Sequence, residues 1–268
     1  MDTTTSPRQP AFLPGGPEAL FAVDGFAYTD GEVRARMLLG PWSDGLGGAG
    51  SIGVLVDNIL GYALIAQAPD ERWSVSTEIS VDFLRPLPGN GTWLSARGRT
   101  VDVGAAAGLA EGSVFGEDGR LIARSRQWGR FVGRGPGPDG DVLPGHHSRA
   151  TASVLNDLRQ EVGAAEGRAQ LRFGVADELV NPHGTLHGGV TLWAAGLVAG
   201  AALSTLTATL NPASIAVSYL RPFPHGDVAE IQAEVVSRGR SLALTRVTGR
   251  NRAGKPCIVA AVHHHSLG

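Results

Sequence analysis

Two stretches of the chain share an alternating pattern of apolar and polar residues that ends in the same Leu-Arg-Pro-x-Pro sequence. The first, STEISVDFLRPLP, starts at Ser76, and the second, PASIAVSYLRPFP, starts at Pro212. The alternating apolar positions are Ile79, Val81 and Phe83 in the first stretch and Ile215, Val217 and Tyr219 in the second. A period of two predicts a half-buried β-strand in each stretch, and the strand ends at the proline because proline cannot donate a hydrogen bond to a sheet.

The segments around these strands also correspond, which indicates an internal repeat. Upstream of each strand a glycine-rich turn leads into a long apolar helix, GLGGAGSIGVLVDNILGYALIA in the first half and GTLHGGVTLWAAGLVAGAALS in the second. Downstream, two strand-like runs flank a turn, at 108–115 and 121–131 in the first half and at 241–250 and 257–265 in the second. Chance similarity between two strands would not reproduce this order, so each half is predicted to be one α+β unit.

The repeat divides the chain into two domains. We expect residues 1–20 to be disordered or extended and residues 21–132 to form the first domain. Residues 133–150, GRGPGPDGDVLPGHHSRA, are rich in glycine and proline, which predicts a linker. The second domain is expected over residues 151–268, and it begins with a short amphipathic helix over 151–165.

The composition narrows the classes of function. Of the 268 residues 43% are hydrophobic and 18% charged, so the chain can bury a substantial core. The net charge is -2 and there is no basic stripe, which argues against nucleic acid as a partner. The N-terminus has no basic start followed by an apolar run, and glycines and polar residues interrupt the apolar helices. These features predict a cytoplasmic protein with no signal peptide and no membrane partner.

Metal or cofactor chemistry is not expected from the residues that could support it. The single cysteine, Cys257, excludes an internal disulfide and a cysteine-based zinc site. The three histidines at 263–265 lie on a predicted strand, where successive side chains face opposite sides and cannot converge on one ion. We therefore predict neither a metal nor a cofactor.

A polar turn with two histidines precedes the second apolar helix, and its residues carry a family resemblance. The pattern is Asn181, Gly184, His187, Gly188 and Gly189, followed by a strand that ends in Leu-Arg-Pro. It resembles the hotdog-fold acyl-CoA thioesterases, and in particular the phenylacetyl-CoA thioesterase type.

The first half is similar instead to the acid-bearing half of the acyl-CoA thioesterase II type. This resemblance is carried by Asp57 in the apolar helix, by Ser76 ten residues before Pro86, and by Gln127 in the run GEDGRLIARSRQWGRF. Together the two likenesses cover the chain from about Phe21 onward.

The resemblance implies an α+β fold called a double hotdog. In that fold each long helix is wrapped by an antiparallel sheet, and the sheets of two units pair into a pseudo-dimer. Active sites lie across the pair, where the glycine turn of one unit faces the helix acid of the other. Homo-oligomers of double-hotdog units are a further expectation, since hotdog proteins often assemble beyond the pair.

Each half has lost a different part of the expected site. In the phenylacetyl-CoA type the acid follows the motif histidine by nine residues, and nine residues after His187 stands Gly196. The same spacing counted back from Asp57 reaches Gly48, so the first half has the acid without the histidine. One complete site is therefore expected, between the turn of the second half and Asp57 of the first.

Hydrolysis of an acyl-CoA thioester at this site assigns roles to the matched residues. The backbone N–H groups of Gly188 and Gly189 would stabilise the negative carbonyl oxygen at a helix N-terminus, while Asn181 and His187 shape the turn or assist carbonyl binding. Apolar neighbours remove water from Asp57, which makes it a better proton acceptor, and it either activates a water molecule or attacks the carbonyl itself. Ser76 and Gln127 would orient the water or the carboxylate.

Other interpretations of these residues remain open at the level of sequence. Asp57 with Asn58 fits the solvated edge of an amphipathic helix, Gln127 fits an exposed strand position, and the Ser76 assignment can slip by one residue. His183 is interpreted as a solvated loop residue. Two further functions are a non-catalytic acyl-CoA-binding or sensing protein of the same fold and a hotdog dehydratase or hydratase, although the latter places its acid and histidine differently.

Overall fold

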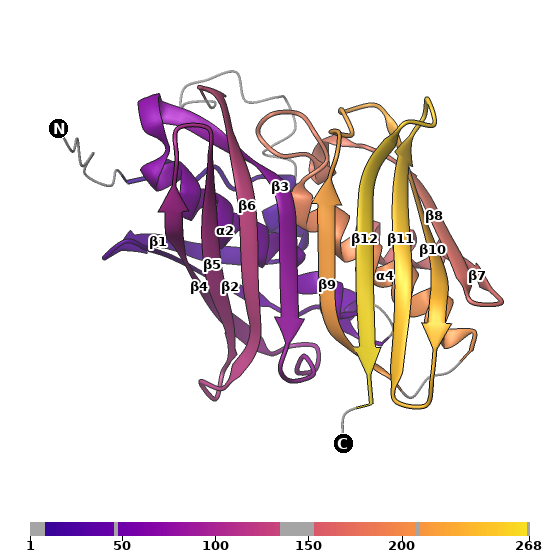
Figure 1. Ribbon diagram of the computed structural model, residues 1–268. Coiled ribbons are helices and arrows are strands. Elements are labelled where there is room, and N and C mark those ends of the chain that lie inside the picture. Colours follow the sequence, from indigo (N-terminus) through magenta and orange to yellow (C-terminus); the bar gives the residue numbers. More distant parts are fainter. Residues whose placement is uncertain (1–8, 46–47, 135–152, 207–209, 267–268) are drawn as a thin grey trace.

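The computed structural model describes residues 9–45, 48–134, 153–206 and 210–266 (Figure 1). Most of the predicted linker 133–150, together with residues 1–8, lies outside this described part. Within it, twelve strands form one antiparallel sheet in the order β1-β2-β4-β5-β6-β3-β9-β12-β11-β10-β8-β7. The six strands of the first half therefore occupy one side of the sheet and those of the second half the other (Figure 1).

The strands follow the predicted pattern in both halves. Those of the first half are β1 (Val23–Thr29), β2 (Glu32–Leu38), β3 (Arg72–Phe83), β4 (Trp93–Val103), β5 (Ala107–Gly116) and β6 (Leu121–Arg134). Those of the second half are β7 (Gly163–Ala165), β8 (Arg168–Gly174), β9 (Asn211–Tyr219), β10 (Val228–Arg238), β11 (Leu242–Asn251) and β12 (Pro256–His265). The two alternating stretches that reveal the repeat are β3 and β9.

The halves join where β3 pairs with β9 at the centre of the sheet. The pairing is antiparallel, and Ser80 lies opposite Ala216. The repeat matches Leu84 with Leu220, so Ser80 and Ala216 are also equivalent positions in the two halves. A residue that pairs with its own equivalent lies on a two-fold axis. The two halves therefore join in the way that the subunits of an isologous dimer do, but within one chain.

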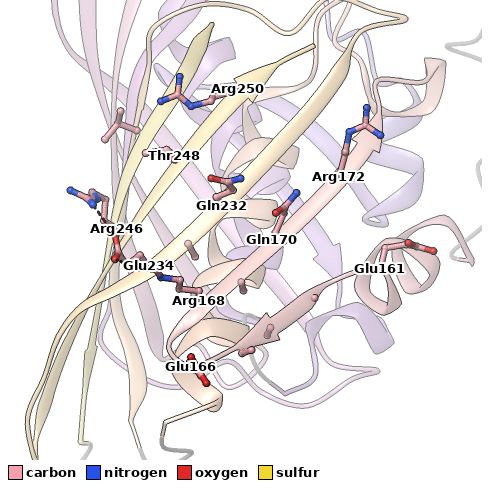
Figure 2. Close-up of a pocket in the computed structure, with 16 residues that line it drawn as sticks. Glu161, Glu166, Arg168, Gln170, Arg172, Gln232, Glu234, Arg246, Thr248 and Arg250 are labelled. Atoms are coloured by element: carbon pink, nitrogen blue, oxygen red, sulfur yellow. Dashed lines mark hydrogen bonds and ion pairs between the residues drawn. The ribbon is translucent and has the colours of Figure 1, made fainter. Parts of the chain in front are cut away.

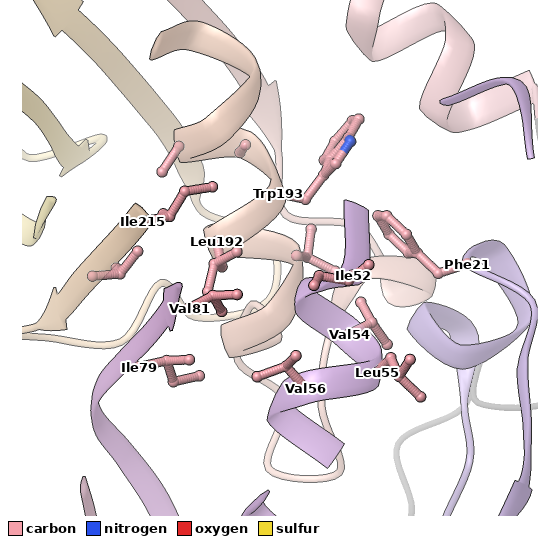
Figure 3. Packing of buried hydrophobic residues seen from close by; sticks show 14 of the residues in the cluster. Phe21, Ile52, Val54, Leu55, Val56, Ile79, Val81, Leu192, Trp193 and Ile215 are labelled. Carbon is pink, nitrogen blue, oxygen red and sulfur yellow. The ribbon is translucent and has the colours of Figure 1, made fainter. Parts of the chain in front are cut away.

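The two long helices α2 (Gly53–Gln67) and α4 (Gly188–Ser204) pack against the same face of the sheet (Figure 1). Both are buried on almost every side, and their apolar side chains meet those of β3 and β9 in one core (Figure 3). The helix starts cross at glycines, since a methyl group on Gly189 would lie 2.5 Å from backbone atoms of Gly53 and Val54. Glycine at these positions lets the two backbones approach closely enough to bring the turn of one half to the helix of the other.

The N-terminal segment differs from the prediction. Residues 1–20 were expected to be disordered or extended, but Gly16–Leu20 forms the short helix α1, which starts with Pro17 in its first turn and buries Glu18 and Leu20. Apolar burial accounts for this order, because Leu20 and Phe21 belong to the central core. Four short 3₁₀ turns complete the described helices: η1 (Pro41–Ser43), η2 (Gly48–Ile52), η3 (Pro69–Glu71) and η4 (Asp177–Leu179).

The helix expected over 151–165 is shorter than predicted. The structure has α3 at Ser153–Gln160, and residues 163–165 form the edge strand β7 instead. A turn separates the two elements, and β7 pairs with β8 through Ala164 and Ala169. Sheet pairing has therefore overridden the local helical preference of the alanines.

One helical run, Gly48–Gln67, has the length and apolar composition of a membrane-crossing helix. However, 83% of its most apolar window is buried inside the protein, because it comprises η2 and the core helix α2. Its apolarity is accounted for by packing against the sheet and α4.

Candidate active site

Two hollows mark the surface of the described residues. The first lies on the outer face of the second half, over β7, β8, β10 and β11 (Figure 2). Its charged lining includes Arg168 and Arg246, which both pair with Glu234. No predicted site residue lines this hollow.

The second hollow is a cavity of about 480 Å³ between the two halves. Six of the seven predicted site residues line it: Asp57, Ser76, Gln127, Asn181, His187 and Gly188. The seventh, Gly189, contacts Asp57 through its backbone. The structure thus brings the predicted residues of both halves to one place.

Asp57 lies in α2, and groups from two segments, β3 and the start of α4, surround its carboxylate. Ser76 Oγ donates to Oδ1 at 2.9 Å, and the backbone N–H of Gly189 donates to Oδ2, also at 2.9 Å. His187 Nδ1 lies 3.1 Å from the same Oδ2. The Asp57 side chain is 11% exposed, so these groups rather than bulk water surround most of the carboxylate.

His187 is the N-cap of α4 and is buried between two carboxylates. Its Nδ1 accepts from Gly189 N–H at 3.0 Å and faces Asp57, and its Nε2 lies 3.4 Å from Glu18 Oε1. Burial lowers the pKa of His187, but the charges of Asp57 and Glu18 outweigh it and raise the pKa above its ordinary value.

The sequence prediction missed Glu18. It is 5% exposed and accepts hydrogen bonds from Gly15 N–H at 2.7 Å and from Asn58 Nδ2 at 2.8 Å. Burial by itself would raise the pKa of Glu18, yet the hydrogen bond and charge of His187 and the other two donors lower it to about 2. The local signal was Pro17-Glu18 at a helix start, followed by the apolar Leu20 and Phe21. Asn58 is therefore a buried partner of Glu18, and the interpretation of Asp57-Asn58 as a solvated helix edge is wrong.

A β-bulge turns Ser76 toward Asp57. The pairing of β3 with β6 skips Thr77, so that Ser76 pairs with Gly129 and Glu78 pairs with Trp128. After the bulge the buried positions of β3 are Ile79, Val81 and Phe83; before it Ser74 is buried and Ser76 lines the cavity. A bulge inserts one residue and reverses which face alternate side chains occupy, which is how an even-numbered serine shares the inner face with odd-numbered apolar residues.

Gln127 lies in β6 opposite Ile79 and is 1% exposed, so its interpretation as an exposed strand residue is wrong. Its side-chain oxygen has no hydrogen-bond partner in the described part of the chain. A methyl group on Gly61, one helical turn beyond Asp57, would lie 3.8 Å from Gln127 Nε2. A buried amide oxygen without a partner is costly, so this atom is available to a water molecule or a substrate group in the cavity.

Asn181 organises the turn that precedes α4. Its Oδ1 accepts from the backbone N–H of His183 at 2.9 Å and from both the N–H and the hydroxyl of Thr185 at 3.2 Å. On the other side, Tyr219 donates its hydroxyl to Gly188 O at 2.7 Å. The turn is therefore held at both ends before any ligand binds.

The backbone N–H groups of Gly188 and Gly189 differ in whether they are free to bind a substrate oxygen. Sequence reasoning assigned both to the carbonyl oxygen, but the N–H of Gly189 is shared between Asp57 and His187. Gly188 N–H has no acceptor among the described residues and lies at the first position of α4, where the helix dipole favours negative charge. A methyl group on Gly188 would lie 2.7 Å from Asp57 Oδ2, so only glycine leaves room for the carboxylate there.

Residues of both halves also form the rim of the cavity. His183 contacts Trp73 edge-on, with the ring centroids 5.1 Å apart, and it is more exposed than His187. Arg130 and Arg221 line the same cavity, and Arg221 donates to Pro256 O at 2.9 Å. His183 is thus part of the cavity lining as well as of the exposed loop.

The equivalent position in the second half is filled. Gly196 corresponds to Asp57, and a methyl group there would lie 3.1 Å from Gly50 Cα and from Ile215 Cδ1. The nearby Trp193 is fully buried against Phe21, with ring centroids 5.6 Å apart (Figure 3). Ser76 likewise has Pro212 as its counterpart in β9. The residues of this region pack against one another, whereas Asp57 and Ser76 of the first half line the cavity.

Comparison with known proteins identifies the same family for both halves. Residues 5–131 match the family model for the acyl-CoA thioesterase C-terminal domain, and residues 177–265 match the model for the N-terminal domain. Acyl-coenzyme A thioesterase 13 from Homo sapiens and from Pongo abelii are each 33% identical over 112 residues, which covers 40% of this chain and 78% of the relative.

Solved structures with the same fold cover nearly the whole chain. The tesB protein of Mycobacterium avium subs paratuberculosis has a TM-score of 0.65 at 15% identity and covers 94% of this chain and 98% of its own. Acyl-CoA thioesterase II TesB2 from Mycobacterium marinum has a TM-score of 0.63 at 13% identity with the same coverage. These likenesses concern the fold, which is the predicted double hotdog. The chain therefore belongs to the acyl-CoA thioesterase family and is a thioester hydrolase with a double-hotdog fold.

Proposed function

We propose that this protein hydrolyses an acyl-CoA thioester to the free acid and coenzyme A at a single composite site between its two halves. The observation that carries the proposal is the contact of Asp57 in the first half with Gly189 N–H and His187 in the second. Ser76 completes the set of donors around the carboxylate. A partly buried acid with a free helix N-terminus beside it suits attack on a carbonyl carbon.

In the proposed reaction Asp57 acts as a general base toward a water molecule. The water loses a proton to Asp57 while its oxygen forms a bond to the thioester carbon. The carbonyl oxygen becomes negative and accepts from Gly188 N–H, with Asn181 and His187 holding the turn in place. The carbon–sulfur bond then breaks, and the proton held by Asp57 passes to the leaving sulfur, which regenerates the carboxylate.

General-base catalysis is favoured over nucleophilic attack by the hydrogen bonds at Asp57. Donors already engage both of its oxygens, and a carboxylate held in this way must lose hydrogen bonds to attack carbon. Accepting a proton from water leaves them in place. The unpartnered oxygen of Gln127 supports the same route, since it can accept a hydrogen bond from the second O–H of the water and orient the molecule.

The remaining cavity lining supports binding of the two ends of the substrate. Ile65, Trp73 and Val132 offer an apolar surface for the acyl group. Arg130 and Arg221 offer positive charge for the phosphates of coenzyme A.

The first experiment replaces Asp57 and measures hydrolysis across a panel of acyl-CoA esters of different chain length. Asp57→Asn keeps the shape and removes the base, and we expect kcat/KM to fall by about a hundredfold to ten-thousandfold. Exchange of the exposed Asp118 for asparagine is the matched control and should leave the rate unchanged. Equal rates for Asp57→Asn and the unaltered protein would exclude Asp57 as the base.

A single turnover in ¹⁸O-labelled water, with enzyme in excess, separates the two routes. General-base catalysis places the label in the released acid in the first turnover. Nucleophilic attack forms an anhydride, and when water then attacks the Asp57 carbon of that anhydride the released acid is unlabelled and the label stays on Asp57. Mass spectrometry of the peptide containing Asp57 would detect it, and a label there would exclude the general-base route.

A further inference from the structure

We propose that Glu18 is a positioning residue of this site, which acts through His187 to hold the Asp57 carboxylate in place. The inference rests on the proposed role of Asp57 and adds a third segment, helix α1, to a site otherwise built from the two repeats. Glu18 lines the same cavity as Asp57 and Gly188, and it is linked to Asp57 through the imidazole ring of His187 between them.

Contacts at both oxygens hold the Glu18 carboxylate in place. One carboxylate oxygen accepts from Gly15 N–H at 2.7 Å, and the other accepts from Asn58 Nδ2 at 2.8 Å and faces His187 Nε2 at 3.4 Å. Asn58 is itself fixed, because its amide also donates to Val54 O at 2.8 Å. A carboxylate buried among three donors stays ionised, so it places a fixed negative charge beside His187.

That charge determines the protons on His187. An ionised Glu18 keeps a proton on Nε2, and an ionised Asp57 only 3.1 Å from Nδ1 requires a proton there as well. A protonated Nδ1 can no longer accept the hydrogen bond from Gly189 N–H that the neutral ring accepts, so in this state Gly189 N–H donates to Asp57 alone. His187 is then an imidazolium between two carboxylates, and the ion pair it forms with Asp57 holds that carboxylate in position.

The position of Glu18 depends on contacts with both halves. Helix α1 belongs to the first half in sequence, but it packs on η4 of the second, and a methyl group on Gly16 would overlap the backbone of Glu178. Glu18 reaches Asn58 in the first half and His187 in the second from this place. The segment therefore joins the halves at the point where the site is formed.

The test compares Glu18→Gln, which removes the charge and keeps the size, with Glu18→Asp, which keeps the charge. Glu161→Gln removes an exposed carboxylate and is the matched control. Two quantities are measured for each protein: the pH dependence of kcat/KM and the titration of His187 by nuclear magnetic resonance, assigned by its loss in His187→Gln. The titration needs no substrate, so it tests the effect of Glu18 on His187 even if the protein does not hydrolyse acyl-CoA.

We expect Glu18→Gln to shift the titration of His187 and the alkaline limb of the kcat/KM profile to lower pH, by about one unit or more. Glu18→Asp should restore at least part of both shifts, and Glu161→Gln should show neither. A fall in rate and in thermal stability with both pH dependences unchanged would mean that Glu18 is only structural and would overturn the proposal. If Glu18→Gln does not fold, the unaltered protein still decides, since titration of His187 below 6.5 would contradict a carboxylate-stabilised imidazolium.

Discussion

At the scale of single residues, the candidate site depends on the positions of a few protons and on the absence of a side chain at Gly188. The Asp57 carboxylate occupies space that a side chain at position 188 would take, and it uses the backbone N–H of position 189. Glycine at 188 therefore has a steric role toward the acid, in addition to the role we propose for its N–H as a donor to the carbonyl oxygen.

Gly188→Ala should reduce catalysis more than stability. The new methyl group would lie 2.7 Å from Asp57 Oδ2 and displace the carboxylate from Gly189 N–H. We expect kcat/KM to fall about a hundredfold, the size of effect seen when a catalytic donor or base is displaced, with a small change in melting temperature. Gly174→Ala, where nothing lies near the added methyl group, is the control. Full activity in Gly188→Ala would show that the carboxylate does not need this position.

The buried Glu18–His187 pair predicts a specific pH dependence of stability. Folding lowers the pKa of Glu18 from 4.5 to about 2, so its contribution is present above 4.5 and is lost as the pH falls toward 2. Folding raises the pKa of His187 above 6.5, so its contribution is present below 6.5 and is lost as the pH rises through the folded value.

The free energy of unfolding of the unaltered protein should therefore exceed that of Glu18→Gln most between pH 4.5 and 6.5. We expect a margin of about 2 kcal/mol there, typical of hydrogen bonds to charged groups. Urea titrations of both proteins across pH 3 to 9 measure it. A margin that does not vary with pH would contradict the assigned ion pair.

At the scale of elements, two local irregularities form the site. The bulge at Thr77 brings Ser76 onto the inner face of β3, and the glycine crossing brings the start of α4 against the start of α2. The bulge is repeated in β9, where the pairing with β12 skips Ala213, but Pro212 replaces the serine there. Both halves thus have the bulge, but only the first half has a serine at this position.

Gly189→Ala should weaken the whole fold. Its methyl group would meet backbone atoms of Gly53 and Val54 at 2.5 Å, and backbone cannot move aside as a flexible side chain can. We expect a loss of about 1–3 kcal/mol in the free energy of unfolding, as for other overpacked cores, together with loss of activity because the helices separate at Asp57. Chemical denaturation compared with Gly61→Ala, where a methyl group fits within α2, measures the cost.

At the scale of the whole molecule, the two halves form a symmetric sheet but differ in the residues at equivalent positions of the proposed site. Ser80 still faces its equivalent Ala216 on the axis. Away from the axis, Asp57 has no acidic counterpart, because Gly196 is packed against Gly50 and Ile215. Fusion permits this, since each half can change without a matching change in the other.

The protein should bind one substrate analogue per chain, and restoring an acid at Gly196 should not add a second site. In Gly196→Asp the new side chain would press on Gly50 and Ile215, so we expect lower thermal stability and an unchanged stoichiometry of one. Calorimetric titration with a non-hydrolysable acyl-CoA thioether measures the number of binding sites per chain in both proteins. Two binding sites per chain in either protein would overturn the single composite site.

The sequence by itself determined the repeat, the order of the elements and the kinds of residue at the site. These depend on local periodicity, on turn residues and on motif spacing, all of which can be read within one segment of chain. The strands at 121–131 and 257–265 appear as β6 and β12 for this reason. The complementary losses at Gly196 and Gly48 follow from the motif spacing that the family resemblance implies, and they predicted that Asp57 would face the second half.

Only the tertiary structure decided which groups share protons around Asp57. The burial of Glu18, the face on which Ser76 lies, and the use of Gly189 N–H by the carboxylate depend on contacts between residues far apart in the chain. Strand alternation alone would have turned Ser76 outward, and composition alone left α1 as a disordered or extended segment. Such contacts are fixed by packing of the complete core, which no single segment encodes.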